Sequence, residues 1–209
     1  MNSELKDRLI QHQIEPLLIV ISGPSGVGKD SVVNCMAERN LPFHFVITAT
    51  TRPPRDDETH GEDYFFYSKD EFADMIERGE LLEYAIVYND FKGIPKSQVR
   101  DAFNSGKDVV MRLDVQGAAT IRDLYPEALL IFLITGTEEE LENRLKNRKS
   151  EKPEELKLRI ATARQELKRV VDFDYVVENR DSMLDKTVDT IEAIITAEHH
   201  RVIHRKVII

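Results

Sequence analysis

Apolar runs alternate with amphipathic stretches along most of this chain. Five runs have the length of buried strands, and they lie at residues 17–21, 43–47, 109–113, 129–134 and 175–177. Between most of them the apolar residues recur at the spacing of a helix face. Strands that alternate with helices in this way are typical of a parallel sheet covered by helices on both faces. The pattern therefore predicts an α/β fold.

Residues 64–94 depart from this alternation. Y-F-F-Y, a short helical pattern and L-L-E-Y-A-I-V-Y follow one another without the long crossovers that parallel strands need. Ser68-x-x-Glu71 has the spacing of a capping box, and Gly79 stands where a helix would end. The segment is predicted to be an inserted, mostly antiparallel subdomain with one helix.

Another irregular segment follows the fourth apolar run. Thr137-x-x-Glu140 has capping-box spacing and predicts the start of a helix. Residues 146–155 read K-N-R-K-S-E-K-P-E-E, which is charged, contains proline and is flanked by helical patterns. Its two interpretations are a mobile lid over a binding site and an ordinary solvated loop.

The first apolar run leads directly into the glycine loop S-G-P-S-G-V-G-K-D-S. Backbone amides of such a loop converge on a polyphosphate, and the N-terminus of the next helix adds partial positive charge. Glycine loops also join strands to helices without any ligand, but the flanking strand and helix favour the phosphate interpretation. The expected phosphate-binding residues are Gly23, Pro24, Ser25, Gly26, Val27, Gly28, Lys29, Asp30 and Ser31, with Lys29 against the β and γ phosphates.

The loop departs from the pattern G-x-x-x-x-G-K-[ST] at its last position. Asp30 stands where a hydroxyl usually contacts Mg²⁺, and a hydroxyl arrives only at Ser31. Two alternatives stay open. Either Asp30 binds the metal through its carboxylate, or water and nucleotide oxygens hold the metal.

The formal net charge of −9 argues against a broad nucleic-acid surface, because phosphate backbones require basic surfaces. No apolar run approaches the roughly 20 residues of a transmembrane helix, so no membrane partner is expected. The N-terminus lacks a signal-peptide core, and the lone Cys35 suits a reducing compartment. We expect a cytoplasmic monomer or small homo-oligomer, or an organellar stroma or matrix protein if a leader has been removed.

An acidic chain must hold an anionic ligand with local clusters of cations. One cluster is Arg52 with Arg55 in T-T-R-P-P-R-D-D-E-T-H-G-E-D-Y-F-F, and Tyr64 follows in the same stretch. Two guanidinium groups at this spacing can form a fork around a phosphate. Considered alone, the stretch could equally be a loop of surface charges.

Together with the glycine loop, this stretch resembles the guanylate kinase family, whose mark is T-T-R-x-P-R-x-x-E-x-x-G-x-D-Y-x-F. The resemblance runs from residue 17 to about residue 193 through E-L-L-E-Y-A, G-x-D-V-V-M-R-L-D-V-Q-G-A and R-L-x-x-R. It implies a P-loop nucleoside-monophosphate kinase fold and Mg²⁺-dependent phosphoryl transfer from ATP to GMP. The partners implied are these two nucleotides.

The resemblance also implies how the chain is divided. An N-terminal helical extension would cover residues 1–16, and the guanylate-kinase-like domain residues 17–209. Within the domain, the core would comprise residues 17–47, 95–137 and 170–209. The GMP-binding insertion would be 48–94, and the helical lid that closes on the substrates would be 138–169.

Carried onto this chain, the acceptor-phosphate grip falls on Arg52, Arg55 and Tyr64. Glu83 falls on the position that reads guanine, and Thr48 on a hydroxyl position that lines the same pocket. A carboxylate suits guanine because it accepts hydrogen bonds from N1–H and the 2-amino group together, a pattern that adenine lacks. Without the arginine motif, Glu83 would be interpreted as an exposed strand carboxylate.

On the ATP side, the resemblance assigns Asp114, at the end of an apolar strand, to orienting Mg²⁺. Arg148 and Arg159 match the lid arginines that close over the transferring phosphoryl group, and with Lys29 they are the expected catalytic residues. Arg144 would lie nearby on the nucleotide side, and Asn179 would contact the adenine.

The chain departs from the most familiar members of the family in the base pocket. Lys92-Gly93-Ile94 replaces Y-G-[ST], and Arg112 replaces an acid two residues before the strand-end aspartate. Lys92 can still reach the acceptor phosphate. Ile94 cannot bind the guanine O6 through its side chain, so guanine selectivity would depend mainly on Glu83, backbone groups and water. These substitutions indicate a plastid-like or bacterial-like subtype.

Two other functions remain open at this point. G-K-D-S also resembles ribose 1,5-bisphosphate phosphokinase, a relative with the same core whose acceptor needs no guanine reader. The intact arginine motif and Glu83 argue against it. Guanylate-kinase-like scaffold modules bind peptides and have lost catalysis, but such modules usually lack the working phosphate loop and lid arginines that this chain retains.

Overall fold

The computed structural model describes residues 15–56, 58–87, 89–146 and 153–209, so nearly all of the proposed N-terminal extension lies outside it. The central element is a five-stranded sheet in the order β2-β7-β1-β8-β9, and all its neighbouring strands are parallel. Each predicted run forms one strand. The bounds are β1 (Leu18–Ser22), β2 (Phe43–Phe45), β7 (Asp108–Arg112), β8 (Leu129–Ile134) and β9 (Tyr175–Glu178). The predicted α/β fold is confirmed.

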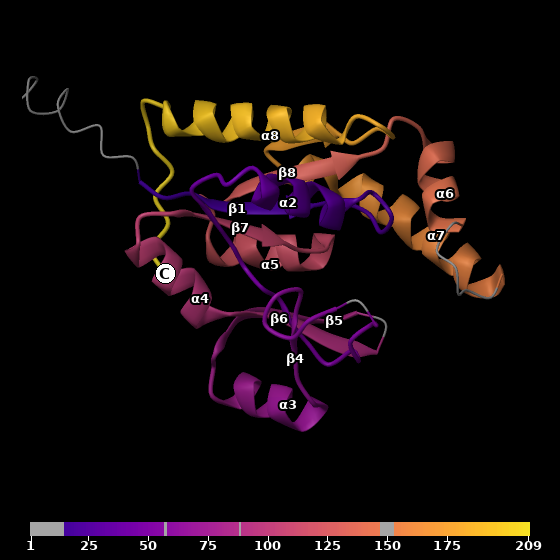
Figure 1. Ribbon diagram of the computed structural model, residues 1–209, viewed down its shortest axis with the longest axis horizontal. Coiled ribbons are helices and arrows are strands. Elements are labelled where there is room, and N and C mark those ends of the chain that lie inside the picture. Colours follow the sequence, from indigo (N-terminus) through magenta and orange to yellow (C-terminus); the bar gives the residue numbers. More distant parts are fainter. Residues whose placement is uncertain (1–14, 57, 88, 147–152) are drawn as a thin grey trace, which may run out of the picture.

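Helices cover both faces of this sheet (Figure 1). One face carries α2 (Lys29–Glu38) and α8 (Leu184–His199), and the other carries α4 (Lys96–Asn104) and α5 (Val115–Leu124). The helices α6 (Glu138–Lys146) and α7 (Pro153–Leu167) stand beside the sheet, and the short 3₁₀ helix η1 (Lys168–Asp172) leads from α7 into β9.

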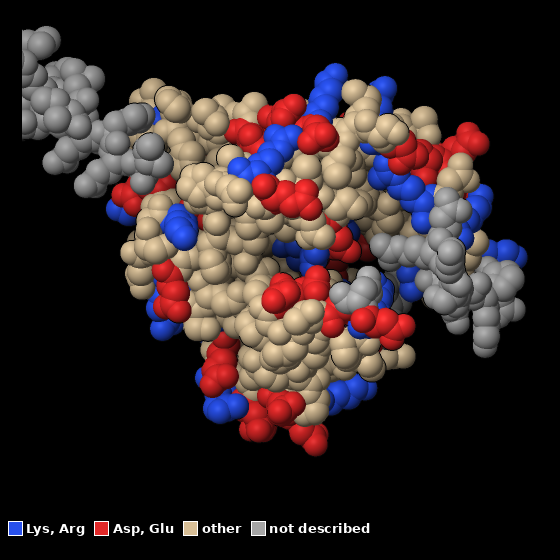
Figure 2. Space-filling model, viewed as in Figure 1, with Lys and Arg blue, Asp and Glu red and all other residues tan. Residues whose placement is uncertain are grey.

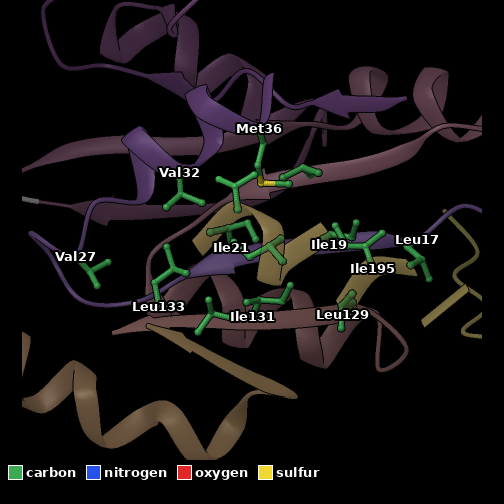
Figure 3. Packing of buried hydrophobic residues seen from close by; sticks show 14 residues of the cluster. Leu17, Ile19, Ile21, Val27, Val32, Met36, Leu129, Ile131, Leu133 and Ile195 are labelled. Carbon is green, nitrogen blue, oxygen red and sulfur yellow. The ribbon is translucent and has the colours of Figure 1, made fainter. Parts of the chain in front are cut away.

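The central strand shows why one sheet needs two layers of helices. Side chains alternate between the faces of a strand, and every residue of β1 is buried. Ile19 and Ile21 pack with Val32 and Met36 of α2 and with Ile195 of α8, as Figure 3 shows. Leu18 and Val20, which point the other way, pack against α4 and α5 on the opposite side. A strand buried on both faces is therefore a continuous apolar run, which is what the sequence contains.

A second, four-stranded sheet lies below the first in Figure 1, in the order β4-β3-β6-β5. Its strands are β3 (Ala49–Thr50), β4 (Phe65–Phe66), β5 (Leu81–Val87) and β6 (Asp90–Pro95), and the helix α3 (Lys69–Glu77) packs on it. The pair β3 and β4 is parallel, and the other two pairs are antiparallel. Ser68 and Glu71 form the predicted capping box at the start of α3, and Gly79 follows its end with φ +64°.

The second capping box forms only in part. Glu140 N donates to Thr137 Oγ1 over 3.1 Å, so α6 begins as predicted. The Glu140 carboxylate, however, turns toward other groups and accepts hydrogen bonds from Gly136 N, Asp181 N and Arg144. These contacts connect the start of α6 to the loop after β9 and to a guanidinium group.

No helix within the described ranges is both long and apolar enough to cross a lipid bilayer.

Candidate nucleotide-binding cavity

A cavity of about 770 Å³ lies where the C-terminal ends of β1 and β7 face the four-stranded sheet. In Figure 2 it is the hollow between the upper and lower parts of the molecule, with charged side chains at its rim. Ligands of open α/β sheets bind outside the carboxyl ends of the strands, which is this position. The predicted site residues that line it are Ser25, Gly26, Gly28, Lys29, Asp30, Ser31, Thr48, Arg52, Arg55, Tyr64, Glu83, Lys92, Asp114, Arg144 and Arg159.

The glycine loop between β1 and α2 has a conformation that requires glycine at both motif positions. Gly23 and Gly28 have φ of +143° and +91°, in the region that side chains disfavour. A Cβ on Gly23 would lie 2.5 Å from Leu133 O, and a Cβ on Gly28 would lie 2.6 Å from Asn179 Nδ2. The glycines leave the loop backbone without side chains, and the loop curls tightly at the N-terminus of a helix, which is the geometry of a phosphate site.

The ammonium group of Lys29 lies inside the curl of this loop. Its Nζ donates to Gly23 O over 2.6 Å and to Pro24 O over 3.1 Å. Desolvation by the surrounding protein lowers the pKa of Lys29 to about 8, although the carboxylates of Glu166, Asp30 and Asp114 oppose the shift. A polyphosphate in the loop would supply the negative charge that keeps this lysine protonated.

Asn179 and Arg144 brace the loop from behind. Asn179 Nδ2 and Arg144 Nη1 donate to the same acceptor, Val27 O, over 2.8 and 3.0 Å. Arg144 Nη2 also donates to Asn179 O over 2.8 Å. Asn179 is buried and does not line the cavity, whereas Arg144 does. Both residues therefore shape the phosphate loop in this structure, and their predicted contacts with the nucleotide stay predictions.

Glu166, near the end of α7, is a site residue that the sequence analysis missed. Its Oε2 accepts a hydrogen bond from Ser25 N in the phosphate loop over 3.1 Å. Burial raises the pKa of Glu166 above its usual value, and the hydrogen bond from Ser25 N and the charge of Lys29 offset only part of this shift. The available signal was its position seven residues after Arg159, because residues two helical turns apart lie on the same face. Arg159 also lines the cavity, while Arg148 lies outside the described residues.

Asp114 caps the N-terminus of α5 and lines the cavity. Its Oδ1 accepts hydrogen bonds from Gln116 N over 2.9 Å and from Gly117 N over 2.8 Å. No described hydrogen bond engages its Oδ2, so one carboxylate oxygen is available beside the phosphate loop. Mg²⁺ in phosphate-transfer sites is typically held by one or two carboxylates plus phosphate and water oxygens. The donor set in this structure fits that ion.

Four basic residues, Arg52, Arg55, Lys92 and Arg112, line the cavity around Tyr64 and Glu58. The guanidinium carbons of Arg52 and Arg112 lie 5.3 and 5.2 Å from the centre of the Tyr64 ring, and Lys92 Nζ lies 5.6 Å from it. Arg52 also pairs with Glu58 over 2.7 Å. Arg55 is more exposed than these three; its backbone N–H donates to Glu58 over 2.8 Å, and its Nη1 lies 3.9 Å from Glu58 Oε1. The two arginines of the predicted fork therefore both pair with Glu58, and both line the cavity.

Glu83 of β5 is a buried carboxylate whose Oε2 has no hydrogen-bond partner among the described residues. Burial raises its pKa to about 7, and the negative charge of Asp114 adds to the shift. A buried acceptor without a donor is costly, so the cavity is incomplete until a ligand supplies one. Thr48, also buried, lines the same cavity.

The glycine loop and the buried carboxylate of Glu83 line one cavity. The chain also matches known proteins. The family model described as guanylate kinase matches residues 15–198. This chain belongs to the guanylate kinase family.

Relatives from plants and bacteria share most of its length. "Guanylate kinase 2, chloroplastic/mitochondrial" of Oryza sativa is 51% identical over 194 residues, which are 92% of this chain and 68% of that protein. "Guanylate kinase" of Clostridioides difficile is 39% identical over 193 residues, which are 92% of this chain and 93% of that protein. The crystal structure of guanylate kinase from Anaplasma phagocytophilum has a TM-score of 0.75 at 27% identity, and covers 91% of this chain and 89% of its own.

Within this guanylate kinase family member, the unusual residues of the base pocket have separate roles. Ile94 is fully buried in the apolar cluster between the main sheet and α4, so it packs the core and does not line the cavity. Gly93 leaves room for β5, since a Cβ there would lie 2.9 Å from Glu83 O. Lys92 and Arg112 line the cavity on the side of Tyr64.

The Glu83→Gln variant is expected to be more stable than the wild type without ligand near pH 8 and similar to it near pH 5. The pKa of Glu83 is higher in the folded protein than in the unfolded chain, so the folded protein favours the protonated carboxyl. The stability that this protonated carboxyl contributes is lost as the pH rises through about 7. Glutamine is neutral at both pH values. The expected gain near pH 8 is about 1–3 kcal/mol, measured by denaturant unfolding. A gain of equal size near pH 5 would contradict the assigned cause.

Proposed function

We propose that this protein is a guanylate kinase that transfers the γ-phosphoryl group of ATP to GMP, giving ADP and GDP. The observation that carries this proposal is the buried carboxylate of Glu83, whose Oε2 has no donor in the described part of the chain and which lines the same cavity as Lys29 and Arg52. Guanine presents N1–H and a 2-amino group side by side and can satisfy such an acceptor. Family membership and the names of the relatives support the same reaction.

On the donor side, we propose that residues 23–31 cradle the phosphates of ATP, with Arg144 and Asn179 behind the loop. Asp114 would hold Mg²⁺, which when bound offsets charge on the phosphate oxygens. On the acceptor side, Thr48 and Glu83 would bind the base, and Arg52, Arg55, Tyr64 and Lys92 the phosphate.

The protein forms no covalent bond to the substrates in this reaction; it positions them and stabilises charge. A phosphate oxygen of GMP attacks the γ-phosphorus of ATP in line, forming one P–O bond as the bond to the leaving ADP oxygen breaks. No side-chain base is needed, because a nucleotide phosphate with a second pKa of about 6 is already ionised near neutral pH. Lys29, Arg159 and Arg148 would offset the charge on the transferred group. Closure of the lid, proposed as residues 138–169, would exclude water.

The test is an ADP-release assay with ATP, Mg²⁺ and separate acceptors. GMP, dGMP, IMP, AMP, UMP, CMP and ribose 1,5-bisphosphate form the panel. We expect GMP to have the highest kcat/KM. Preference for ribose 1,5-bisphosphate would establish the sugar-phosphate kinase instead, and ATP binding without turnover of any acceptor would indicate a non-catalytic binding module.

The Asp114→Asn variant separates the two roles proposed for this residue. The amide oxygen of asparagine can still accept from the N-terminal amides of α5, so thermal stability should change little. Loss of the negative charge should raise the Mg²⁺ concentration that gives half-maximal activity by about tenfold. Asp114→Ala, which removes the cap as well, should also lower the melting temperature. An unchanged Mg²⁺ requirement in Asp114→Asn would contradict the metal assignment.

The compartment and the assembly follow from less specific observations. We propose a cytoplasmic protein, or a protein of an organellar stroma or matrix, because the relative from Oryza sativa is named chloroplastic/mitochondrial. A monomer or small homo-oligomer is proposed, and the proposed partners are the two nucleotides, without nucleic acid or membrane. The division of the domain into core, insertion and lid is likewise a proposal.

A further inference from the structure

Arg112 is a cation in the cavity that the proposed reaction does not yet use. It is the last residue of β7, at the edge of the sheet where the phosphate loop also lies, and 17% of its side chain is exposed. Arg112 Nη1 pairs with Asp30 Oδ1 over 2.9 Å. Asp30 directly follows Lys29 in the first turn of α2. Arg112 is thus attached to the donor side of the cavity through its ion pair.

The same guanidinium group also belongs to the acceptor side. Its carbon lies 5.2 Å from the centre of the Tyr64 ring, which Arg52 and Lys92 approach at 5.3 and 5.6 Å. Three cationic groups therefore surround one phenol ring. Among the ion pairs of the described residues, Arg112 is the one of these three that pairs with a residue of α2, so it lies between the phosphate loop and the acceptor-phosphate residues.

The charges in this cluster are not balanced by the protein. Arg52 has Glu58 as its carboxylate partner, and Arg112 has Asp30, whose side chain is 58% exposed. The described part of the chain gives Lys92 no ion pair. Burial lowers the pKa of Lys92, and repulsion by Arg112 lowers it further. The cavity lining as a whole also carries carboxylates, but around Tyr64 three cations face two paired carboxylates, Glu58 and Asp30. A local excess of positive charge in a partly desolvated position favours a bound anion.

We propose that Arg112 binds the acceptor phosphate together with Arg52 and Lys92, and that Asp30 holds Arg112 in position rather than binding Mg²⁺. The proposal rests on the function proposed above and adds a ligand of the acceptor to it. A planar guanidinium group can donate two parallel hydrogen bonds, so Arg112 can keep one pair of N–H groups on Asp30 and offer others to a phosphate. The cluster would therefore select acceptors with a dianionic phosphate.

The first test is calorimetric binding of GMP and of guanosine, which lacks the phosphate, to the Arg112→Met variant. We expect GMP to bind about 10- to 100-fold more weakly than to the wild type, the effect of one charge-assisted contact. Guanosine should bind with unchanged affinity. A general structural defect would weaken both ligands, so equal losses, like an unchanged affinity for GMP, would overturn the proposal.

Arg39→Met is the matched control. Arg39 is similarly withdrawn from solvent, with 24% of its side chain exposed, and it pairs with Asp185 over 3.0 Å. It lies between α2 and α8, outside the cavity lining. This variant should bind GMP and guanosine as the wild type does. Arg112→Lys keeps the positive charge but loses the paired N–H donors of the guanidinium group. Its affinity for GMP should fall between those of the wild type and Arg112→Met.

The role of Asp30 is tested by combining variants. Asp30→Asn should weaken GMP binding in the wild-type background and have little further effect in Arg112→Met, because it acts through Arg112. The Mg²⁺ requirement for activity should be unchanged in Asp30→Asn. A raised Mg²⁺ requirement, or additive losses in the double variant, would overturn the positioning role. If the wild type itself showed no preference for GMP over AMP, the proposed function would fail. If the wild type preferred GMP but Arg112→Met bound GMP equally well, only the role of Arg112 would fail.

Discussion

The Lys29→Met variant is expected to lose about 10²- to 10³-fold in kcat, in line with removal of one preorganised charge from a transition state. The ammonium group lies in the curl of the phosphate loop, held by Gly23 O and Pro24 O. From there it can reach phosphate oxygens as charge spreads over the transferred group. Steady-state ADP release with saturating ATP and GMP measures the effect.

The fold should survive this substitution. Burial lowers the pKa of Lys29 to about 8, which means that its charged form is destabilised in the folded protein. Replacing it with a neutral side chain removes this desolvation cost. The melting temperature is expected to stay at or above the wild-type value. Lys186→Met, at an exposed position of α8, is the control and should keep full activity. Full activity in Lys29→Met would contradict the phosphate-loop mechanism.

The second large effect concerns the guanine reader. Glu83→Gln is expected to lower kcat/KM for GMP by about 10²- to 10³-fold, because two hydrogen bonds to a charged acceptor are each worth about 1.5–3 kcal/mol. Glutamine keeps one acceptor oxygen but places an amide NH₂, which is a donor, against a donor of guanine. The rate with AMP, which has no such donors, should change little. Glu80→Gln, at an exposed glutamate one residue before β5, is the matched control.

Glu83 should also give base binding a pH dependence. Only the ionised carboxylate accepts from both guanine donors, and its pKa is about 7 in the ligand-free cavity. Guanosine affinity should therefore fall as the pH is lowered through about 7. Below that pH the free carboxyl is protonated, so binding should release a proton to the solvent. Guanosine is the appropriate ligand because it has no phosphate that titrates in this range. Persistence of the same pH step in Glu83→Gln would falsify the assignment.

The main sheet could be predicted from the sequence because its signals are local. Each strand is a short apolar run, and all the strands are parallel, so both faces are buried and no alternation obscures the run. The capping box of Ser68 and Glu71 is also local, since both partners lie within one helical turn. Glu140 shows the limit of such patterns. Its spacing was right, but Arg144 and Asp181 N compete for the carboxylate.

The glycine loop and the proposed acceptor residues Arg52, Arg55 and Tyr64 could be named from the sequence because each set lies within one short stretch of chain. The contact of Glu166 and the ion pair of Arg112 could not be predicted, because their partners are distant in the chain. Glu166 contacts Ser25 across 141 positions. Arg112 contacts Asp30 through the pairing of β7 with β1, which only the folded sheet brings about. Ile94 has no side-chain group that could hydrogen-bond a base, which its residue type alone establishes, whereas its burial against α4 is visible only in the packed core.

The most direct test is a crystal structure of the protein with GMP and a non-hydrolysable ATP analogue. We expect guanine N1 and the 2-amino group within about 3 Å of the Glu83 carboxylate, and the acceptor phosphate on Arg52. We also expect the triphosphate in the loop of residues 23–28, with Lys29 Nζ on phosphate oxygens. A guanine base bound away from Glu83, or a triphosphate outside the loop, would contradict the proposed function.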